Sequence, residues 1–229
     1  MKIHIFYRHY NVSGGDGPRR PQGFDYEECY GNLLTSLPGW ESDMYRVNIV
    51  FDGKGMESNW IQDYSYHKIY NINEGSDMGS FFKTCNIIKE DKNIQEGDLI
   101  YLLENDYLHV KGWIYKIFEL FQTYSGLDYV SLYDHNDKYF LPQYDNLLSK
   151  IFTTKTHHWR STPSTCGSFV ISKERFDEDY DVLSTMRGDH NKFLWLNENR
   201  GRSVISPIPG LSTHCMEGLM SPTINWQEV

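Results

Sequence analysis

The stretch Leu99-Ile100-Tyr101-Leu102-Leu103-Glu104-Asn105-Asp106 changes abruptly from apolar to acidic. Five consecutive apolar or aromatic residues are typical of a strand that is covered on both faces, as in a mostly parallel sheet. In open α/β sheets, ligands bind just beyond the carboxyl ends of such strands. We therefore expect an α/β fold in which Glu104, Asn105 and Asp106 follow a central strand at the binding edge of the sheet.

Runs of strand length alternate with helix-like segments around this stretch, which indicates a mostly parallel central sheet flanked by helices. The expected strands are 3–6, 47–51, 68–72, 99–103, 129–132 and 151–154. Helices are expected from Asp25, which can cap the first turn, to Pro38, then after Ser80, and from about Lys111. After about residue 140 the apolar pattern loosens, so we expect loops there rather than a second domain.

The composition limits the class of protein. A chain of 229 residues with 39% hydrophobic residues suits one compact domain. Its 22 basic and 31 acidic side chains give a formal charge of −9, which repels a phosphate backbone and argues against nucleic-acid binding. The longest apolar runs are far shorter than the ~20 residues that span a bilayer, and the N-terminus does not read as a signal peptide. We expect a cytoplasmic protein without a membrane span.

The four cysteines are not grouped in the sequence. Cys29, Cys85, Cys166 and Cys215 contain no CxxC pair. Neither a zinc site nor a disulfide framework is indicated by this spacing, so we expect free thiols.

Glu104 and Asp106 are separated by one residue, so both carboxylates point to the same side if the strand geometry continues. Carboxylate oxygens in this arrangement suit Mg²⁺ or Mn²⁺. A solvated acidic turn is the alternative interpretation of the same pair.

Polar residues also follow the other expected strands of the first half. Arg8, Asp52 and Asp77 come after the first, second and third strands, so together they line one edge of the sheet. The segment 75–80 leads into a helix whose free amide groups can hold phosphate, with Lys83 one turn further on. A plain helix cap is the alternative interpretation of segment 75–80.

Two long blocks between residues 102 and 139 resemble a known family. They are LLENDYLHVKGW at 102–113 and LYDHNDKY at 132–139. SKIF at 149–152, HWRSTPST at 158–165 and PGLSTH at 209–214 follow in the same order. These blocks look like the GT-A-type nucleotide-sugar-dependent glycosyltransferases of bacteria and large DNA viruses. The resemblance is close over roughly residues 100–226 and limited to the layout before that.

The resemblance implies a single GT-A-like (Rossmann-like) domain over residues 1–229. Its nucleotide-sugar donor half would be about 1–106, and its acceptor and catalytic half about 107–229. The family's Asp-x-Asp motif holds Mn²⁺ or Mg²⁺, and this chain has Glu104-Asn105-Asp106 in its place. A late histidine often joins that metal, which points to His214. The residues expected to contact the donor are Arg8, Asp52, Asp77, Lys83 and Asn105.

Asp189 is the candidate general base. Transfer with inversion needs a carboxylate that takes the proton from the acceptor hydroxyl. Asp189 lies at the expected start of a late helix, which resembles the acid-bearing helix start of inverting GT-A enzymes. An ordinary N-cap is the alternative role for this residue.

These observations together predict an inverting, metal-dependent glycosyltransferase, hexosyltransferase-like in class. The donor would be a nucleoside diphosphate sugar, with UDP- or GDP-sugars favoured, and the acceptor a glycan or glycoconjugate. One alternative is a sugar-1-phosphate nucleotidyltransferase, because the loop SGGDGPRRP at 13–21 resembles that family's phosphate cradle. Another is a non-catalytic carbohydrate-binding protein, which the replacement of the first Asp by Glu104 leaves open.

Overall fold

A computed structural model describes residues 1–10, 19–39, 41–65 and 67–229. In these residues a nine-stranded sheet runs through the molecule in the order β3-β2-β1-β4-β9-β6-β10-β8-β7. Its strands are β1 (Ile3–Tyr10), β2 (Tyr45–Asp52), β3 (Lys68–Ile72), β4 (Leu99–Glu104), β6 (Tyr129–Val130), β7 (Ile151–Thr153), β8 (His158–Thr162), β9 (Phe169–Ser172) and β10 (Val204–Ile208). Strands β8 and β9 run opposite to the others. The sheet is therefore mostly parallel in direction, as predicted.

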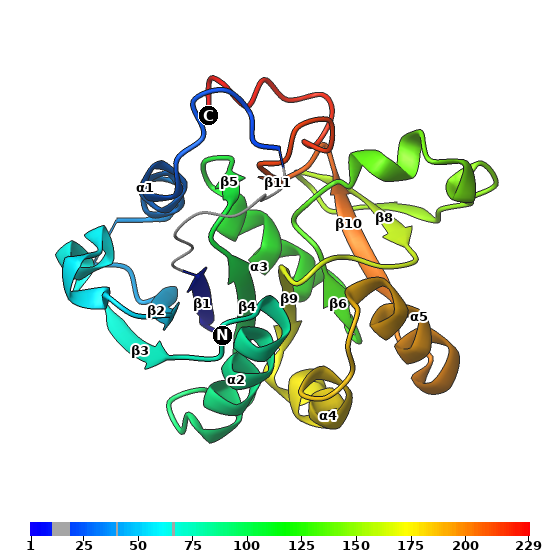
Figure 1. Ribbon diagram of the computed structural model, residues 1–229. Helices are drawn as coiled ribbons and strands as arrows, with labels where there is room; N and C mark the ends of the chain where they lie inside the picture. Colours follow the sequence, from blue (N-terminus) through cyan, green and yellow to red (C-terminus); the bar gives the residue numbers. More distant parts are fainter. Residues whose placement is uncertain (11–18, 40, 66) are drawn as a thin grey trace.

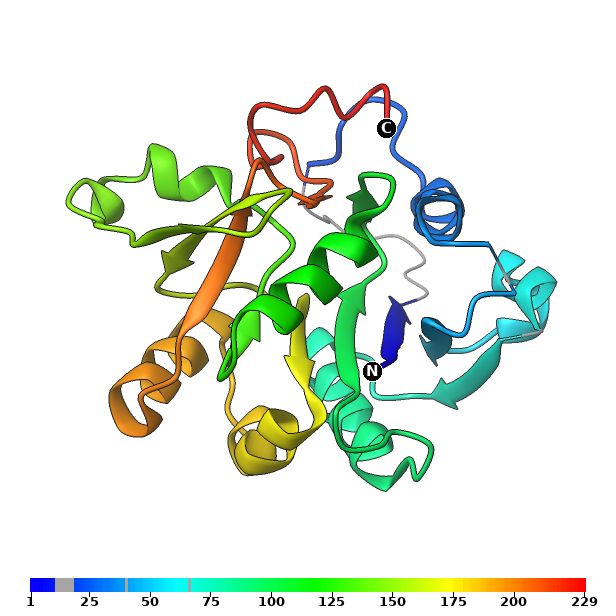
Figure 2. The ribbon, with the colours of Figure 1, turned by 180° about the vertical axis from the view of Figure 1, so that it is seen from behind.

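Helices cover both faces of this sheet. One face packs against α1 (Tyr26–Ser36) and α3 (Trp113–Thr123), and α3 is in front in Figure 2. The opposite face packs against α2 (Asp77–Glu90), α4 (Lys173–Leu183) and α5 (Asp189–Arg200), which are in front in Figure 1. Four short 3₁₀ helices are η1 (Met56–Ser58), η2 (Trp60–Tyr64), η3 (Asn136–Tyr139) and η4 (Pro142–Tyr144).

Strand β4 shows why an unbroken apolar run was needed at the centre. Leu99, Tyr101 and Leu103 belong to the hydrophobic core on the α1 and α3 side. Ile100 and Leu102 belong to the core on the α2, α4 and α5 side. Because alternate side chains enter two different cores, no position from Leu99 to Leu103 is left for a charged residue, and the first one, Glu104, comes at the end of the strand.

The helix starts follow from capping side chains. Asp25 accepts hydrogen bonds from the backbone N–H groups of Glu27 and Glu28, so α1 begins as predicted. The prediction for α2 is wrong by a few residues, because the helix begins at Asp77. The Ser76 side chain accepts the N–H of Gly79 and thereby caps the helix one turn earlier.

The second half of the chain is more regular than expected. Strands β8, β9 and β10 and helix α4 occupy the region in which loops were predicted, whereas α5 begins at Asp189, as expected for the late helix. These strands are short and partly polar, so they carry little periodic signal of their own. Pro207 interrupts β10 in sequence, yet it is tolerated because β10 pairs there with β8 alone.

A second, two-stranded sheet carries part of the binding edge. It consists of β5 (Tyr107–His109), which follows β4 after a two-residue turn, and β11 (Ser212–His214). The pairing places His214 opposite Tyr107. Among the helices of the described residues, none combines the length and the apolar character needed to cross a membrane.

Candidate active site

The carboxyl ends of β1 and β4 bring two predicted site residues together. Arg8 is the register partner of Glu104 on the neighbouring strand. Its Nη2 lies 3.1 Å from Oε1 of Glu104, and its Nη1 lies 3.0 Å from Oδ1 of Asp77 at the start of α2. Burial opposes the charge of Arg8, yet the carboxylates of Glu104, Asp77 and Asp189 raise its pKa above the ordinary value. A buried guanidinium therefore joins three candidate residues at one edge of the sheet.

Glu104 ends β4, and Asn105 and Asp106 form the turn that follows. The expectation that strand geometry continues through Asp106 is therefore wrong. The two carboxylates are nevertheless neighbours. Burial raises the pKa of Glu104, and the negative charge of Asp106 adds to the rise while Arg8 opposes it. Ser168 also donates a hydrogen bond to Oε2 of Glu104 over 3.0 Å.

Asp106 is held by two groups from distant parts of the chain. Its Oδ2 lies 3.0 Å from Nε2 of His214 and 2.9 Å from Nη1 of Arg20. The rings of His214 and Tyr107 are stacked, with their planes 3° apart. Burial would raise the pKa of Asp106, but His214 and Arg20 hold it below the usual range. Conversely, Asp106 raises the pKa of His214 against the effect of burial.

The donor atoms at this position suit a divalent cation in part. Oδ1 of Asp106 is buried and has no hydrogen-bond partner among the described residues. Together with the His214 nitrogen and the nearby Glu104 carboxylate, this oxygen belongs to a set of donor atoms of the kind that bind Mn²⁺ and Mg²⁺. No three His, Cys, Asp or Glu side chains of the described ranges are already grouped around one point. Arg8 and Arg20 neutralise the carboxylates in this arrangement.

Asp52 ends β2 and is completely buried. Its Oδ1 accepts the backbone N–H groups of Glu74 and Gly75 at 2.8 and 3.2 Å, which fixes the loop between β3 and α2. Its Oδ2 has no hydrogen-bond partner in the described part of the chain. Asp52 thus presents one occupied and one free acceptor oxygen.

His9 is a site residue that the sequence analysis did not single out. Its ring lies against Phe51 and Trp60, with centroids 5.6 and 5.0 Å away. Its Nδ1 lies 3.2 Å from Nδ2 of Asn105, so that amide is held toward β1. Burial lowers the pKa of His9 to about 4, which leaves the ring neutral near pH 7.

Asp77 and Lys83, two residues expected to contact the donor, differ in how they are related to this site. Asp77 at the first residue of α2 is bound to Arg8, whereas Lys83 is exposed on the same helix. Among the described residues, no hydrogen bond or ion pair joins Lys83 to the site. Its role as a donor contact stays a prediction.

Asp189 is the first residue of α5, and the N-cap position is taken by Gly188 with a φ of 78°. The capping alternative for Asp189 is therefore wrong. Its Oδ1 lies 3.4 Å from Nζ of Lys192, one turn further along the helix. Its charge reaches Arg8, which places the predicted base within electrostatic range of the Glu104 pair.

Gly167 closes the site from the loop before β9. A Cβ atom there would lie 2.9 Å from Nη2 of Arg8 and 3.2 Å from Oε1 of Glu104. The Arg8–Glu104 pair therefore requires glycine at this position. The sequence held only a weak signal for it, a glycine next to the block that carries the family resemblance.

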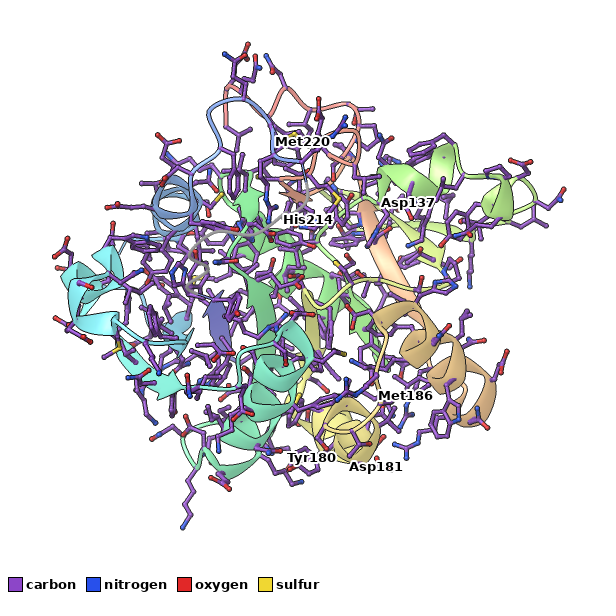
Figure 3. All side chains as sticks on the ribbon, in the orientation of Figure 1. Asp137, Tyr180, Asp181, Met186, His214 and Met220 are labelled. Atoms are coloured by element: carbon purple, nitrogen blue, oxygen red, sulfur yellow. The ribbon has the colours of Figure 1, made fainter. Side chains whose placement is uncertain are left out.

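Between η3 and β8, charged residues neutralise each other. Arg160 lies 2.8 Å from Oδ1 of Asp134, and its guanidinium stacks over the ring of Tyr139. Tyr139 donates to the same carboxylate. In Figure 3, His214 lies near this region, while Tyr180 and Asp181 lie at the other end of the molecule, around α4.

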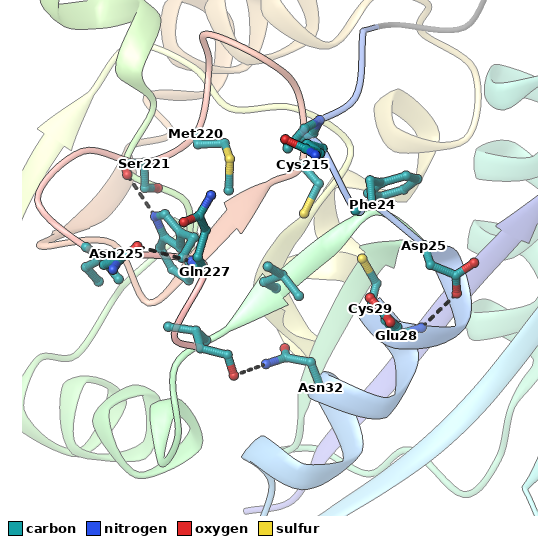
Figure 4. A pocket seen from close by; sticks show the side chains of 17 residues that line it. Phe24, Asp25, Glu28, Cys29, Asn32, Cys215, Met220, Ser221, Asn225 and Gln227 are labelled. Atoms are coloured by element: carbon teal, nitrogen blue, oxygen red, sulfur yellow. Dashed lines mark hydrogen bonds between the residues drawn. The ribbon is translucent and has the colours of Figure 1, made fainter.

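A cavity of about 740 Å³ lies next to this edge, between the start of α1, β5 and the C-terminal segment. Figure 4 shows the side chains of Cys29 and Cys215 facing it, with Asn32 bonded to the backbone of Val229. Cys215 follows His214 directly, and its carbonyl accepts a hydrogen bond from Arg20 over 2.9 Å. None of the predicted site residues lines this cavity.

Comparison with known proteins shows the fold. No family model and no curated protein matches the chain. Among solved structures, a mycobacterial protein is 8% identical over 90% of this chain and 65% of its own, with a TM-score of 0.52. Staphylococcus aureus TarS is 11% identical over 90% of this chain and 58% of its own, also with a TM-score of 0.52.

The synthetase of CMP:2-keto-3-deoxy-manno-octonic acid, complexed with CTP, is 11% identical over 92% of each chain, with a TM-score of 0.53. This chain spans less than two thirds of the mycobacterial protein and of TarS. At these identities the likeness concerns the fold alone. The chain has a GT-A-like, Rossmann-like α/β fold.

Proposed function

We propose that the chain is an inverting, metal-dependent glycosyltransferase that moves a sugar from a nucleoside diphosphate to a hydroxyl of a glycan or glycoconjugate. The observation that supports this most is the convergence of Asp106 and His214 at the edge of the sheet. These two residues are 108 positions apart in the chain. Oδ1 of Asp106 is buried without a hydrogen-bond partner among the described residues, so it is available to coordinate a metal ion.

The donor would lie along the carboxyl ends of β1, β2 and β4. Asp52 offers its free Oδ2 to an N–H group of the base. Arg8 and the N-terminus of α2 supply positive charge for the diphosphate. Asp106 and His214, with Glu104 beside them, would hold Mn²⁺ or Mg²⁺, which when bound neutralises charge on the leaving diphosphate.

Asp189 would take the proton of the acceptor hydroxyl. As the new bond to the anomeric carbon forms, the bond to the diphosphate breaks on the opposite side. The residue lies at the exposed start of α5, 26% exposed at its side chain, so a bound acceptor can reach it.

A thermal-shift screen with UDP-, GDP-, CMP- and dTDP-sugars, each with and without Mn²⁺, tests this function. A ligand that binds the folded state raises its melting temperature. We expect one nucleotide sugar to stabilise the wild-type protein more strongly with Mn²⁺, and Asp106→Ala to abolish that effect. Asp145→Ala, which removes an exposed carboxylate, is the control and should behave as wild type. Unchanged affinity and metal dependence in Asp106→Ala would refute the metal assignment.

A sugar-1-phosphate nucleotidyltransferase is the second candidate, because the CTP-bound synthetase matches this chain over 92% of both lengths. Residues 13–18 of the loop that suggested this activity lie outside the described residues. Incubation with a nucleoside triphosphate and a sugar phosphate separates the two, since this candidate alone releases pyrophosphate. A carbohydrate-binding protein without catalysis would bind sugar after chelation of metal and ignore nucleotides.

A further inference from the structure

Lys192 lies in the first turn of α5, three residues after Asp189, and none of its surface is exposed. Lysine is among the side chains least often fully buried, because its ammonium group loses hydration. Nζ lies 3.4 Å from Oδ1 of Asp189 and 4.0 Å from the ring centroid of Phe81. One carboxylate and one aromatic face thus replace the lost water.

The groups that face Lys192 come from three elements. Asp189 belongs to its own helix, Arg8 to β1, and Phe81 and Cys85 to α2. Burial lowers the pKa of Lys192, and Arg8 adds to the lowering, while Asp189 and Cys85 oppose it. The guanidinium of Arg8 also lies over the Phe81 ring, 5.3 Å from its centroid. Lys192 therefore lies between the start of α5 and the Arg8–Glu104 pair.

Asp189 has one side-chain partner in the described part of the chain, and that partner is Lys192. Gly188 contributes no side chain at the N-cap, so the helix start itself does not fix the Asp189 carboxylate. Stability alone does not require a lysine here, because an apolar side chain of similar size usually contributes as much as a buried ion pair.

We propose that Lys192 is a positioning residue whose buried ammonium group holds the Asp189 carboxylate in the orientation that accepts the acceptor's proton. This inference rests on the proposed function, in which Asp189 is the general base. Lys192 has no exposed surface, so it acts on the reaction through Asp189 and not by contact with the substrate.

The variant Lys192→Met tests the inference. Its substrate is the nucleotide sugar that stabilises the wild-type protein most. Turnover is measured as the release of the nucleoside diphosphate in the presence of Mn²⁺, with water as the acceptor. We expect kcat to fall ~10- to 100-fold, as is typical when a catalytic group loses its orientation, with KM for the donor unchanged. The melting temperature should be unchanged or higher. Lys192→Arg, which keeps the charge, should restore most of the rate.

Lys89→Met is the control, because Lys89 forms an exposed ion pair with Asp177 of α4 and contacts neither Asp189 nor Lys192 in the described part of the chain, so kcat should be unchanged. If Lys192→Met fails to fold, Lys192→Gln replaces it, since Gln donates hydrogen bonds without a charge. Wild-type kcat in the folded Met or Gln variant would overturn the inference.

A double variant separates this inference from the proposed function. In Asp189→Asn, the additional change Lys192→Met should cause no further loss, because Lys192 acts through Asp189. If Asp189→Asn alone keeps wild-type turnover, the base assignment fails. If it loses turnover while Lys192→Met keeps it, the role of Lys192 is refuted and the proposed function stands.

Discussion

At the scale of single residues, the two oxygens of Asp52 have different tasks. Oδ1 holds the loop before α2, and Oδ2 is a buried acceptor without a partner among the described residues. A buried acceptor left unpaired costs about 1–3 kcal/mol, so a ligand that donates to it gains affinity. This is the reason to expect that Asp52 recognises an N–H group of the nucleotide base.

Asp52→Asn separates these tasks, because the amide retains one acceptor oxygen and replaces the other by a donor. We expect the affinity for the nucleotide sugar to fall by about 10- to 100-fold, the equivalent of one hydrogen bond to a charged group. Isothermal titration calorimetry measures the affinity, and the melting temperature serves as the folding control. In wild type, free nucleoside diphosphate should compete with the donor. Failure to compete well above the donor's concentration would point to a site that reads the sugar instead.

Asp189→Asn removes the proton acceptor and keeps the size of the side chain. Loss of general-base assistance typically lowers the rate by ~10²–10⁴-fold. Because Gly188 occupies the N-cap, no capping bond is lost, but the buried ammonium group of Lys192 loses its carboxylate partner, so the free energy of unfolding should fall by about 3 kcal/mol. Steady-state kinetics and thermal melting measure the two effects. A product that retains the donor's anomeric configuration by NMR would reject inversion.

At the scale of secondary-structure elements, a buried carboxylate ties α4 to α5, to β6 and to the segment before β10. Asp179 is completely buried and accepts hydrogen bonds from Arg200 and Arg202 at 2.9 Å and from Tyr129 at 2.7 Å. Burial would raise its pKa, but these donors hold the pKa below the usual range. Its contribution to stability is therefore present above the unfolded pKa of about 3.9 and is lost as the pH falls through the folded pKa.

Asp179→Asn should lower the free energy of unfolding by about 3 kcal/mol, since it leaves two arginines without a buried partner. Asp181→Asn is the matched control, because Asp181 binds the same Arg200 from an exposed position and should cost less than about 1 kcal/mol. Urea denaturation at pH 7 measures both variants. Donor binding should be retained in each, because α4 lies at the opposite end of the molecule from His214 (Figure 3). Equal losses in the two variants would contradict a special role for the buried pair.

The elements that the sequence predicted well are those with a local signal. Strand β4 has an apolar or aromatic side chain at every position from Leu99 to Leu103, and α1 has a capping Asp25. Strand β10 has neither, because its order depends on β6 and β8, which are more than 40 residues earlier in the chain. Pairing at such separations leaves no periodic pattern in a short segment.

The residues of the candidate site also differ in how well the sequence predicted them. Arg8, Asp52, Glu104 and Asp106 lie at or just beyond the carboxyl ends of β1, β2 and β4, so the direction of the chain already groups them, although β1 continues past Arg8 to Tyr10. Gly167 and Lys192 reach the site through packing of the second half, for which the local sequence held only a weak signal at Gly167 and none at Lys192.

At the scale of the whole molecule, the sheet joins the two halves of the chain. Strands β3, β2, β1 and β4 come from the first half, and β9, β6, β10, β8 and β7 from the second. The site lies where these groups meet, because Glu104 ends β4 and Ser168 precedes β9. Both halves must therefore be folded for Glu104 to have both Arg8 and Ser168 as partners.

Burial in the folded protein also affects several histidines. Burial lowers the pKa of His9, His67 and His135 to about 4 and that of His109 to about 3. Below pH 6.5 the unfolded chain binds protons that these folded groups do not bind, so stability falls as the pH drops from about 6.5 toward 4. Acid sensitivity should therefore begin above the range in which the carboxylates titrate.

His109 isolates this effect, because it is fully buried and its Nε2 contacts the Tyr101 hydroxyl at 2.9 Å. A histidine that the fold keeps neutral lowers the free energy of unfolding by about 2 kcal/mol at pH 5 relative to pH 7.5. This value follows because pH 5 is about 1.5 units below the unfolded pKa of about 6.5. His109→Gln retains a polar partner for Tyr101 and does not titrate. The free energy of unfolding should therefore fall between pH 7.5 and 5 by about 2 kcal/mol less in the variant than in wild type. Urea denaturation at both pH values gives this difference, in which any loss of packing and the change in net charge cancel. An identical fall in both proteins would mean that His109 is protonated in the folded state.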